Sequence, residues 1–238
     1  MKEYFLEISE KQVNSLIKRK FTKGIIAMAR AFAKGETVGI LTARSSKENN
    51  EPLIREIEHI IGEKIKYKYF INDPIKSERI SHIKGSAARK LEIIKEFSNT
   101  FDKVKFYDDE KMNVDIVNVF ARNNNLENKI KAYDIKTFDV NKLDSLFNKK
   151  TNKTIHFFDL DGTVLNVKLP IYITKENGEV IKEISQEEWA TKLNNIIEEL
   201  REKYPDEKFG FDLSWFSDKD KILKQIKPEN FKEEINLP

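Results

Sequence analysis

The feature that most constrains the fold is an alternation of short apolar segments with amphipathic segments over residues 9–158. Apolar segments such as Thr37–Thr42 have the length and composition of strands that are buried on both faces. The segments between them repeat apolar residues every three or four positions, which predicts helices. The alternation therefore predicts an α/β fold, Rossmann-like, with a doubly wound parallel sheet covered by helices on both faces.

The predicted elements follow from these local patterns. The expected strands span residues 37–42, 64–71, 103–107, 129–135 and 154–158. The expected helices span residues 9–34, 52–61, 86–97, 114–121 and 139–148. Ser86 is expected to cap the third of these helices with its hydroxyl, and residues 72–85 are expected to form a loop.

The sequence changes character after Thr163. Residues 171–184 have the pattern of a hairpin that turns at Asn177-Gly178. Residues 186–203 are expected to form a helix, and the aromatic stretch 209–223 is expected to be irregular. The chain is therefore predicted to have two parts, an α/β core over residues 1–165 and a small cap or lid over residues 166–238.

Composition excludes several classes of protein. The chain has 43 Lys and Arg against 40 Asp and Glu, and a net charge of +3 does not by itself indicate nucleic-acid binding. Without cysteine there is no disulfide, thiolate catalysis or cysteine-bound zinc. No apolar stretch approaches the ~20 residues that span a bilayer, and the N-terminus lacks the apolar core of a signal peptide. A soluble, cytoplasmic protein without a membrane partner is expected.

Polar side chains follow three of the predicted strands. Asp159-Leu160-Asp161-Gly162-Thr163 follows strand 154–158, Thr42-Ala43-Arg44 ends strand 37–42, and Asp108-Asp109 follows strand 103–107. Ligands of doubly wound sheets bind beyond the carboxyl ends of the strands, so these groups are expected to share one edge. Each group alone also fits a simpler interpretation, as a turn, a solvated loop or a satisfied buried hydroxyl.

Together these motifs resemble those of the haloacid dehalogenase (HAD) superfamily of phosphohydrolases. "DLDGT" at 159–163 is similar to its first motif, "ILTAR" at 40–44 to its second and "FYDDE" at 106–110 to its fourth. The third motif is a lysine on the preceding helix, matched by Lys90, with Lys84 as the alternative. The resemblance is to the phosphatase domain of bacteriophage polynucleotide kinase/phosphatase and related phage proteins.

The order of the motifs departs from that family, because the first motif comes last. The resemblance then implies a circularly permuted HAD-like core, in which the late strand inserts between earlier ones. The implied strand order has 37–42 beside 154–158 beside 103–107, with 64–71 and 129–135 outside them. A monomer that closes on itself is expected, and the alternative is a dimer that exchanges residues 154–238 about a hinge at 149–153.

The resemblance implies a role for each acidic residue. Asp159 is the expected nucleophile, which forms an aspartyl-phosphate. Asp161 is the expected general acid and then general base. Asp108 and Asp109, with the Asp159 carboxylate and the backbone carbonyl of Asp161, are expected to bind Mg²⁺, which prefers oxygen ligands.

Three further residues are expected to bind the substrate phosphate. Thr42 would donate a hydrogen bond to it, Lys90 would balance its charge, and Arg44 would bind it with its planar fork. A surface salt bridge remains the alternative for Arg44. His156 is expected to be a packed residue of its strand. Four aromatic side chains are expected in the core of the cap, with base stacking as the alternative: Trp189, Phe211, Trp215 and Phe216.

The sequence therefore predicts a Mg²⁺-dependent phosphohydrolase. The expected substrate is a phosphate monoester, either a phosphorylated small molecule such as a nucleotide or a nucleic-acid end. Two alternatives remain open at this point. One is a catalytically inactive binding module that keeps the fold, and the other is a phosphotransferase in which an alcohol replaces water.

Overall fold

The computed structural model describes residues 10–19, 21–44, 47–72, 80, 82–139, 153–165 and 171–212. These residues form two compact units, 10–165 and 171–212, each described here by itself. Several sequence predictions lie outside the described part of the chain. They concern residues 140–148 of a predicted helix, most of the predicted loop at 72–85, and the side chains of Trp189, Trp215 and Phe216.

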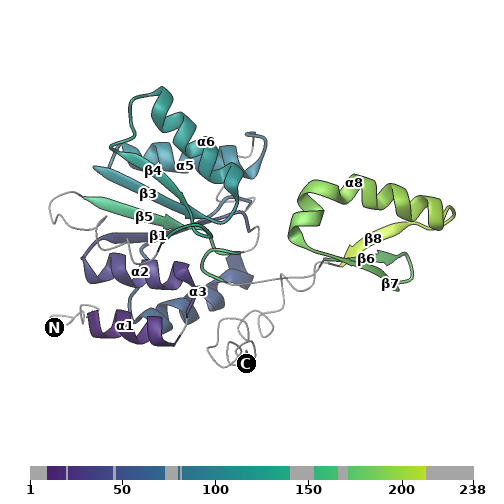
Figure 1. Cartoon of the computed structure of the whole chain (residues 1–238), viewed down its shortest axis with the longest axis horizontal. Coiled ribbons are helices and arrows are strands. Elements are labelled where there is room, and N and C mark those ends of the chain that lie inside the picture. Colours follow the sequence, from purple (N-terminus) through teal and green to yellow (C-terminus); the bar gives the residue numbers. More distant parts are fainter. Residues whose placement is uncertain are drawn as a thin grey trace. The chain divides into compact units, whose positions relative to one another are not determined.

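The larger unit is built on a five-stranded sheet in the order β2-β1-β5-β3-β4 (Figure 1). All four neighbouring pairs are parallel. The predicted strand order is thereby confirmed, with the strand from late in the chain at the centre of the sheet. The strands are β1 (Thr37–Thr42), β2 (Tyr67–Phe70), β3 (Lys103–Asp108), β4 (Ile130–Asp134) and β5 (Thr154–Phe158).

Helices lie on both sides of this sheet, as the alternation predicted (Figure 1). On one side, α5 (Ser86–Ser98) and α6 (Lys111–Asn123) enclose an apolar core with the inward side chains of the strands. On the other side lie α1 (Glu10–Lys18), α2 (Lys23–Ala33) and α3 (Lys47–Ile61). The central strand is buried along its whole length, because helices cover both of its faces.

The single helix predicted over residues 9–34 is wrong, because two helices separated by a break form there. Thr22 is the N-cap of α2, and its hydroxyl accepts a hydrogen bond from the Ile25 N–H at 3.3 Å. The same hydroxyl donates to the Val164 carbonyl at 2.6 Å, just beyond the Asp159–Thr163 turn. A helical period continues through both halves, so the break is marked by the Thr22 cap and by its long-range contact with Val164.

Other boundaries also differ from the predictions. Ser86 does not cap α5: Gly85 is the N-cap, and no side chain caps that end. The helix predicted from Pro52 begins one turn earlier, at Lys47. Pro52 therefore lies inside the helix, although proline is favoured at the first helical position. Strand β2 is shorter than predicted and α6 is longer.

The smaller unit is a three-stranded antiparallel sheet with one helix. The predicted hairpin is confirmed in β6 (Ile171–Lys175) and β7 (Val180–Ile184), and the predicted helix in α8 (Gln186–Lys203). Residues 209–212 were expected to be irregular but pair with β6 as strand β8 (Phe209–Asp212). The buried core consists of Ile171, Ile173, Ile184, Ile196 and Leu200.

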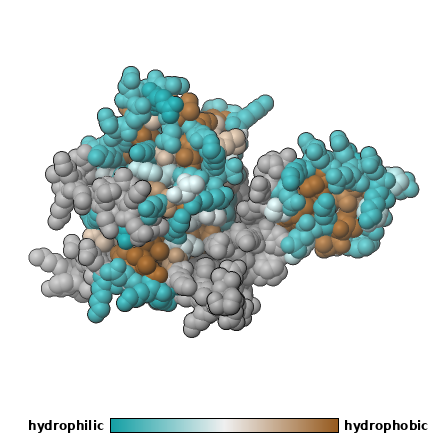
Figure 2. Space-filling view, in the orientation of Figure 1, coloured by the Kyte–Doolittle hydropathy of each residue, from teal (hydrophilic) through white to brown (hydrophobic). Residues whose placement is uncertain are grey.

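Polar and charged side chains make up most of the visible surface of both units, with apolar residues gathered in smaller patches (Figure 2). Within the described ranges, no helix is both long enough and apolar enough to cross a membrane.

Candidate functional site

Three neighbouring strands bring the predicted residues to one edge of the sheet. Thr42 and Asp108 are the last residues of β1 and β3, and Asp159 directly follows β5 between them. The Asp159 N–H donates to the Tyr107 carbonyl at 2.9 Å, which extends the strand pairing to the site. All three polar residues are buried, with at most 5% of their surface exposed. The predicted convergence of these strand ends is therefore present.

The carboxyl cluster of Asp108, Asp109 and Asp159 can hold a metal ion. Each residue offers an oxygen, and the three oxygens lie within 4.8 Å of one another. Burial raises the pKa of Asp159, and the charges of Asp108 and Asp161 raise it further, against the lowering effect of Lys90. Burial also raises the pKa of Asp109. Oxygen donors at this density are the ligands that Mg²⁺ takes, so the residues fit the predicted ion.

Lys90 enters this cluster from α5. Its Nζ lies 2.7 Å from Asp108 Oδ2 and 2.8 Å from Asp159 Oδ1, and only 2% of its side chain is exposed. Burial alone would lower the pKa of Lys90, but the charges of Asp159 and Asp108 outweigh it and raise that pKa. Lys84, the alternative lysine, is exposed. Of the two lysines, Lys90 is the one at the site.

Asn113 on α6 holds Asp108 in place, and sequence reasoning missed it. Its Nδ2 donates to Asp108 Oδ2 at 3.0 Å, while the Glu110 N–H donates to Asp108 Oδ1 at 2.8 Å. Among the described residues, Asn113 Oδ1 is one of two buried side-chain atoms without a hydrogen-bond partner. The sequence did contain a signal for this contact, because Asn113 is a polar residue in the first turn of the helix that follows Asp108-Asp109.

Asp161 has different surroundings from Asp159, although the two residues are only two positions apart. Arg44 Nε donates to Asp161 Oδ2 at 2.9 Å and Nη2 to Oδ1 at 2.5 Å. Arg44 Nη1 donates to Asn50 Oδ1 at 2.8 Å, and Asn50 is 2% exposed. The Asp161 carboxylate therefore contacts Arg44 and does not belong to the carboxyl cluster. This agrees with the prediction that Asp161 would bind the metal ion only through its backbone carbonyl.

A surface salt bridge was the alternative prediction for Arg44, and the ion pair with Asp161 agrees with it in part. It differs from a surface salt bridge, because the Arg44 side chain is only 8% exposed and uses both arms of its fork. Such bidentate pairs fix geometry as well as charge. Phosphate binding by Arg44 stays a prediction. Asn50 was not predicted, and its position near the start of α3 gave no signal of its role.

Two glycines allow the turn after β5 to pack closely. Gly162 has φ +72°, and a Cβ at this position would collide with the Asp109 carboxylate. A Cβ on Gly24 of α2 would collide with the Thr163 carbonyl. Substitution at Gly162 is therefore disfavoured both by backbone conformation and by the contact with Asp109.

Thr42 is placed to act as a donor at the edge of the sheet. Its hydroxyl accepts a hydrogen bond from the Arg44 N–H at 3.4 Å, and its carbonyl accepts one from the Ile71 N–H at 3.0 Å. A hydroxyl that accepts in this way keeps its own proton to donate to an anion. Phosphate binding by Thr42 and Lys90 stays a prediction.

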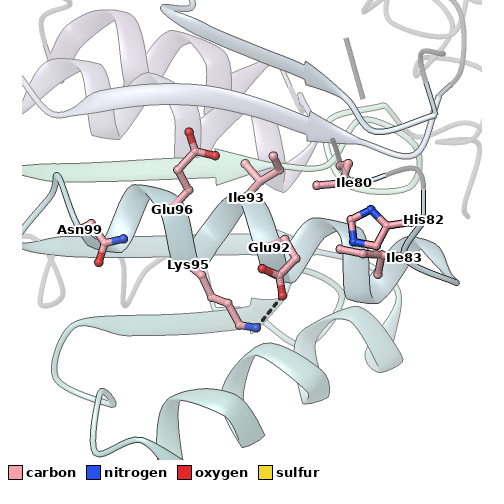
Figure 3. A pocket seen from close by; sticks show the side chains of 8 residues that line it. All are labelled: Ile80, His82, Ile83, Glu92, Ile93, Lys95, Glu96 and Asn99. Carbon is pink, nitrogen blue, oxygen red and sulfur yellow. Dashed lines mark hydrogen bonds and ion pairs between the residues drawn. The ribbon is translucent and has the colours of Figure 1, made fainter. Parts of the chain in front are cut away.

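A cavity of about 410 Å³ lies away from this site, beside α5 (Figure 3). Lys95 and Glu92 on its wall form an ion pair of 2.6 Å with each other. None of the strand-end residues lines it, so the candidate chemistry is not located there. Its lining residues are Ile80, His82, Ile83, Glu92, Ile93, Lys95, Glu96 and Asn99.

His156 is packed inside the sheet, as predicted, and is fully buried. Its Nε2 lies 2.7 Å from Glu36 Oε2, and its Nδ1 lies 3.3 Å from the Tyr107 hydroxyl. Both ring nitrogens thus have partners within the fold.

The chain was compared with protein-family models, with curated proteins and with solved structures, and none of the three comparisons found a match.

Proposed function

We propose that this protein is a Mg²⁺-dependent phosphohydrolase of the HAD type, with Asp159 as the nucleophile. The observation that carries the proposal is the position of Asp159. It follows the central strand, belongs to a carboxyl cluster that can hold a metal ion, and contacts the buried Lys90. A second carboxylate, Asp161, is held apart from that cluster by Arg44.

The proposed reaction has two displacements at phosphorus. In the first, an Asp159 oxygen forms a bond to phosphorus, the bond to the alcohol oxygen breaks, and Asp161 gives its proton to that oxygen. In the second, Asp161 takes a proton from water, the water oxygen bonds to phosphorus, and the bond to Asp159 breaks. The products are the alcohol and inorganic phosphate, and both carboxyl groups return to their starting state.

The remaining residues of the site stabilise charge. Asp108, Asp109, Asp159 and the backbone carbonyl of Asp161 would hold Mg²⁺, which when bound supplies positive charge against the phosphoryl oxygens. Lys90 balances the negative charge of the cluster, and Thr42 donates a hydrogen bond to a phosphoryl oxygen.

Arg44 acts in this proposal as a positioning residue for Asp161. Both Asp161 oxygens receive hydrogen bonds from the guanidinium group, whose third contact is to Asn50. A carboxylate held in this way has one defined orientation. Before it can protonate the leaving group, it must release at least one oxygen from Arg44 and take up a proton from water.

We further propose that the core is a circularly permuted HAD-like domain. Two facts support this: the motifs run in the order second, third, fourth, first, and β5 nevertheless occupies the centre of the sheet. The expected substrate is a phosphate monoester, with a nucleotide or a nucleic-acid end as the candidates that the resemblance suggests.

The first test is release of inorganic phosphate from a generic aryl phosphate, with Mg²⁺ and with a chelator. Phosphorylated metabolites, nucleotides and oligonucleotides with 3′- or 5′-phosphates then define the substrate. The proposal expects Mg²⁺-dependent release that Asp159→Asn abolishes. Absence of release from every compound would contradict it and favour a binding module. Transfer of phosphate to added alcohol in place of water would identify a phosphotransferase.

A further inference from the structure

We propose that Lys136 and Lys23 form a second anion subsite, which takes a phosphate of the substrate other than the one transferred. This inference rests on the proposed function and narrows its substrate class. The substrate would carry at least two phosphate groups, as a nucleoside bisphosphate does, or as does an oligonucleotide end with its neighbouring phosphodiester.

Lys136 lies just beyond β4, the strand next to β3. Its Nζ is 3.2 Å from Asp109 Oδ2, and 63% of its side chain is exposed. Lys23 at the start of α2 donates from its Nζ to the Lys136 carbonyl at 2.8 Å. Two ammonium-bearing residues from distant parts of the chain therefore meet at the side of the site that Asp109 occupies.

The backbone beneath these two lysines is held in place. The Lys136 N–H donates to Asp134 Oδ1 at 2.8 Å, while its carbonyl accepts from Lys23. The residue before Lys23, Thr22, donates to the Val164 carbonyl at 2.6 Å. The Lys136 backbone is thus held by Asp134 and Lys23, and the start of α2 is held by Val164, while the Lys136 ammonium stays exposed on a long side chain that can reorient.

Lys136 can leave its ion pair with Asp109 and bind a phosphate instead. The Lys136 side chain is exposed although Asp109 is mostly buried, and solvent around the ammonium group weakens its attraction to the carboxylate. When Asp109 binds a cation, its negative charge is neutralised and its attraction for the Lys136 ammonium is lost. The ammonium group is a compact point charge with three donors and is then available for a phosphate oxygen.

The charges around the two lysines favour an anion once Asp109 has a cation. Asp134 remains as a carboxylate near them, with one oxygen accepting from the Lys136 N–H. Lys111 lies at the start of α6 and pairs with Asp115 at 2.7 Å. Because Lys111 is already paired, Lys136 and Lys23 are the residues that supply positive charge to an anion here.

The test measures binding, so that it does not depend on turnover. The protein with Asp161→Asn, which slows the reaction, is loaded with Mg²⁺ and titrated calorimetrically with a nucleoside 3′,5′-bisphosphate and with the matching 5′-monophosphate. Lys136→Met and Lys23→Met are each added to this background. Lys131→Met is the control, because it removes the same charge from the exposed start of the same strand.

We expect Lys136→Met to weaken bisphosphate binding about tenfold and monophosphate binding less than about twofold, since one charge-assisted hydrogen bond is lost. Lys131→Met should change neither. A second readout is Mn²⁺ affinity without substrate, which Lys136→Met should raise about twofold because a competing cation is removed. Equal weakening of both nucleotides, or no weakening of either, would overturn the proposal.

A 3′-phosphorylated oligonucleotide forms the second arm and identifies the source of the additional phosphate. If the lysine variants lose affinity only for the bisphosphate, the subsite takes a phosphate of a small molecule. If they lose affinity only for the oligonucleotide, it takes a backbone phosphodiester. If the protein binds the bisphosphate selectively but hydrolyses no monoester, the anion subsite is supported and the proposed phosphatase activity is rejected. Hydrolysis without such selectivity would refute only the subsite.

Discussion

Two buried polar clusters of the larger unit differ in how their charges are balanced. The first is the carboxyl cluster, in which Lys90 faces two of three neighbouring carboxylates. The second surrounds His156 on the same sheet and includes Glu36 and Tyr107. Both lie on β5 or directly after it, and both contain residues that a typical core excludes.

In the His156 cluster every contact is explained by folding alone. Glu36 accepts from Nε2 of the ring, and the Tyr107 hydroxyl can donate to Nδ1, so a neutral imidazole satisfies both partners. Burial lowers the pKa of His156, which favours this neutral form. The hydrogen bond to His156 and the charge of the buried Lys105 on β3 lower the pKa of Glu36, so the carboxylate of this cluster has a balancing charge within the fold.

The carboxyl cluster, in contrast, keeps an excess of negative charge. Three carboxylates share one buried lysine, while Lys136 contributes only from an exposed position. Buried charge without compensation is costly, and folding by itself gives no reason to collect it. Both clusters contain buried polar groups, but only the carboxyl cluster has more negative than positive charge. We therefore use this excess of negative charge, and not burial alone, to identify the candidate site.

The largest expected effect is a loss of activity on substitution in the carboxyl cluster that substitution in the His156 cluster does not cause. Asp159→Asn should reduce turnover of an aryl phosphate by at least about 10³-fold, because the proposed nucleophile is lost. His156→Gln should leave kcat within a few-fold of the wild type. Steady-state kinetics with circular dichroism as a folding control measures both. Near-normal turnover in folded Asp159→Asn protein would refute the aspartyl-phosphate.

A smaller effect is expected at Asp161. Asp161→Asn should slow hydrolysis of an alkyl phosphate by about 10²- to 10³-fold, in the range for general acid catalysis. An aryl phosphate has a good leaving group and should be affected much less in its first displacement, measured as a burst. Arg44→Lys should show the same dependence on leaving group with a smaller loss, since it keeps charge but not the fork. Equal losses for both substrates would argue against an acid role.

Metal titrations should separate residues within the carboxyl cluster. Asp108→Ala should raise the Mg²⁺ concentration for half-maximal activity by about 10- to 100-fold, because a proposed ligand is removed. Lys90→Met should leave that midpoint unchanged or lower it, because a positive charge near the ion is removed, while kcat falls. An unchanged midpoint in Asp108→Ala would exclude this residue from the metal site.

The smallest effect concerns pH and the His156 cluster. The pKa of His156 is lowered in the folded state from the ordinary 6.5, so the unfolded chain binds the proton more readily. The stability that follows is complete above that pH and is lost as the pH falls below it. The lowered pKa of Glu36 acts in the same direction below its ordinary 4.5. The contribution of His156 to the melting temperature should therefore be lost between about pH 7.5 and pH 5.5, while Asp159, whose pKa is raised to about 8, acts in the opposite direction over the same interval.

His156→Gln provides the matched comparison, because glutamine hydrogen-bonds without titrating in this range. Its melting temperature should be lower throughout, and its difference from the wild type should become smaller as the pH falls over the same interval. Parallel curves for the two proteins would show that His156 is not the titrating group.

The sequence by itself determined the order of elements and the edge at which the site lies. Strand and helix patterns are local, and parallel strands place their carboxyl ends together, so Thr42, Asp108 and Asp159 could be assigned to one edge. The hairpin at Asn177-Gly178 was also predictable, because that dipeptide specifies a tight turn locally.

The tertiary structure decided which side chains meet. The local pattern placed Lys90 on a helix and Lys84 in a loop, but only the packing of α5 shows that the Lys90 ammonium enters the carboxyl cluster, whereas Lys84 is exposed. The partners of Arg44 come from a strand end 117 positions away and from the next helix. Periodicity reports which face of an element is buried, whereas the choice of partner depends on how separate elements dock. For that reason sequence located the site and only the fold assigned its contacts.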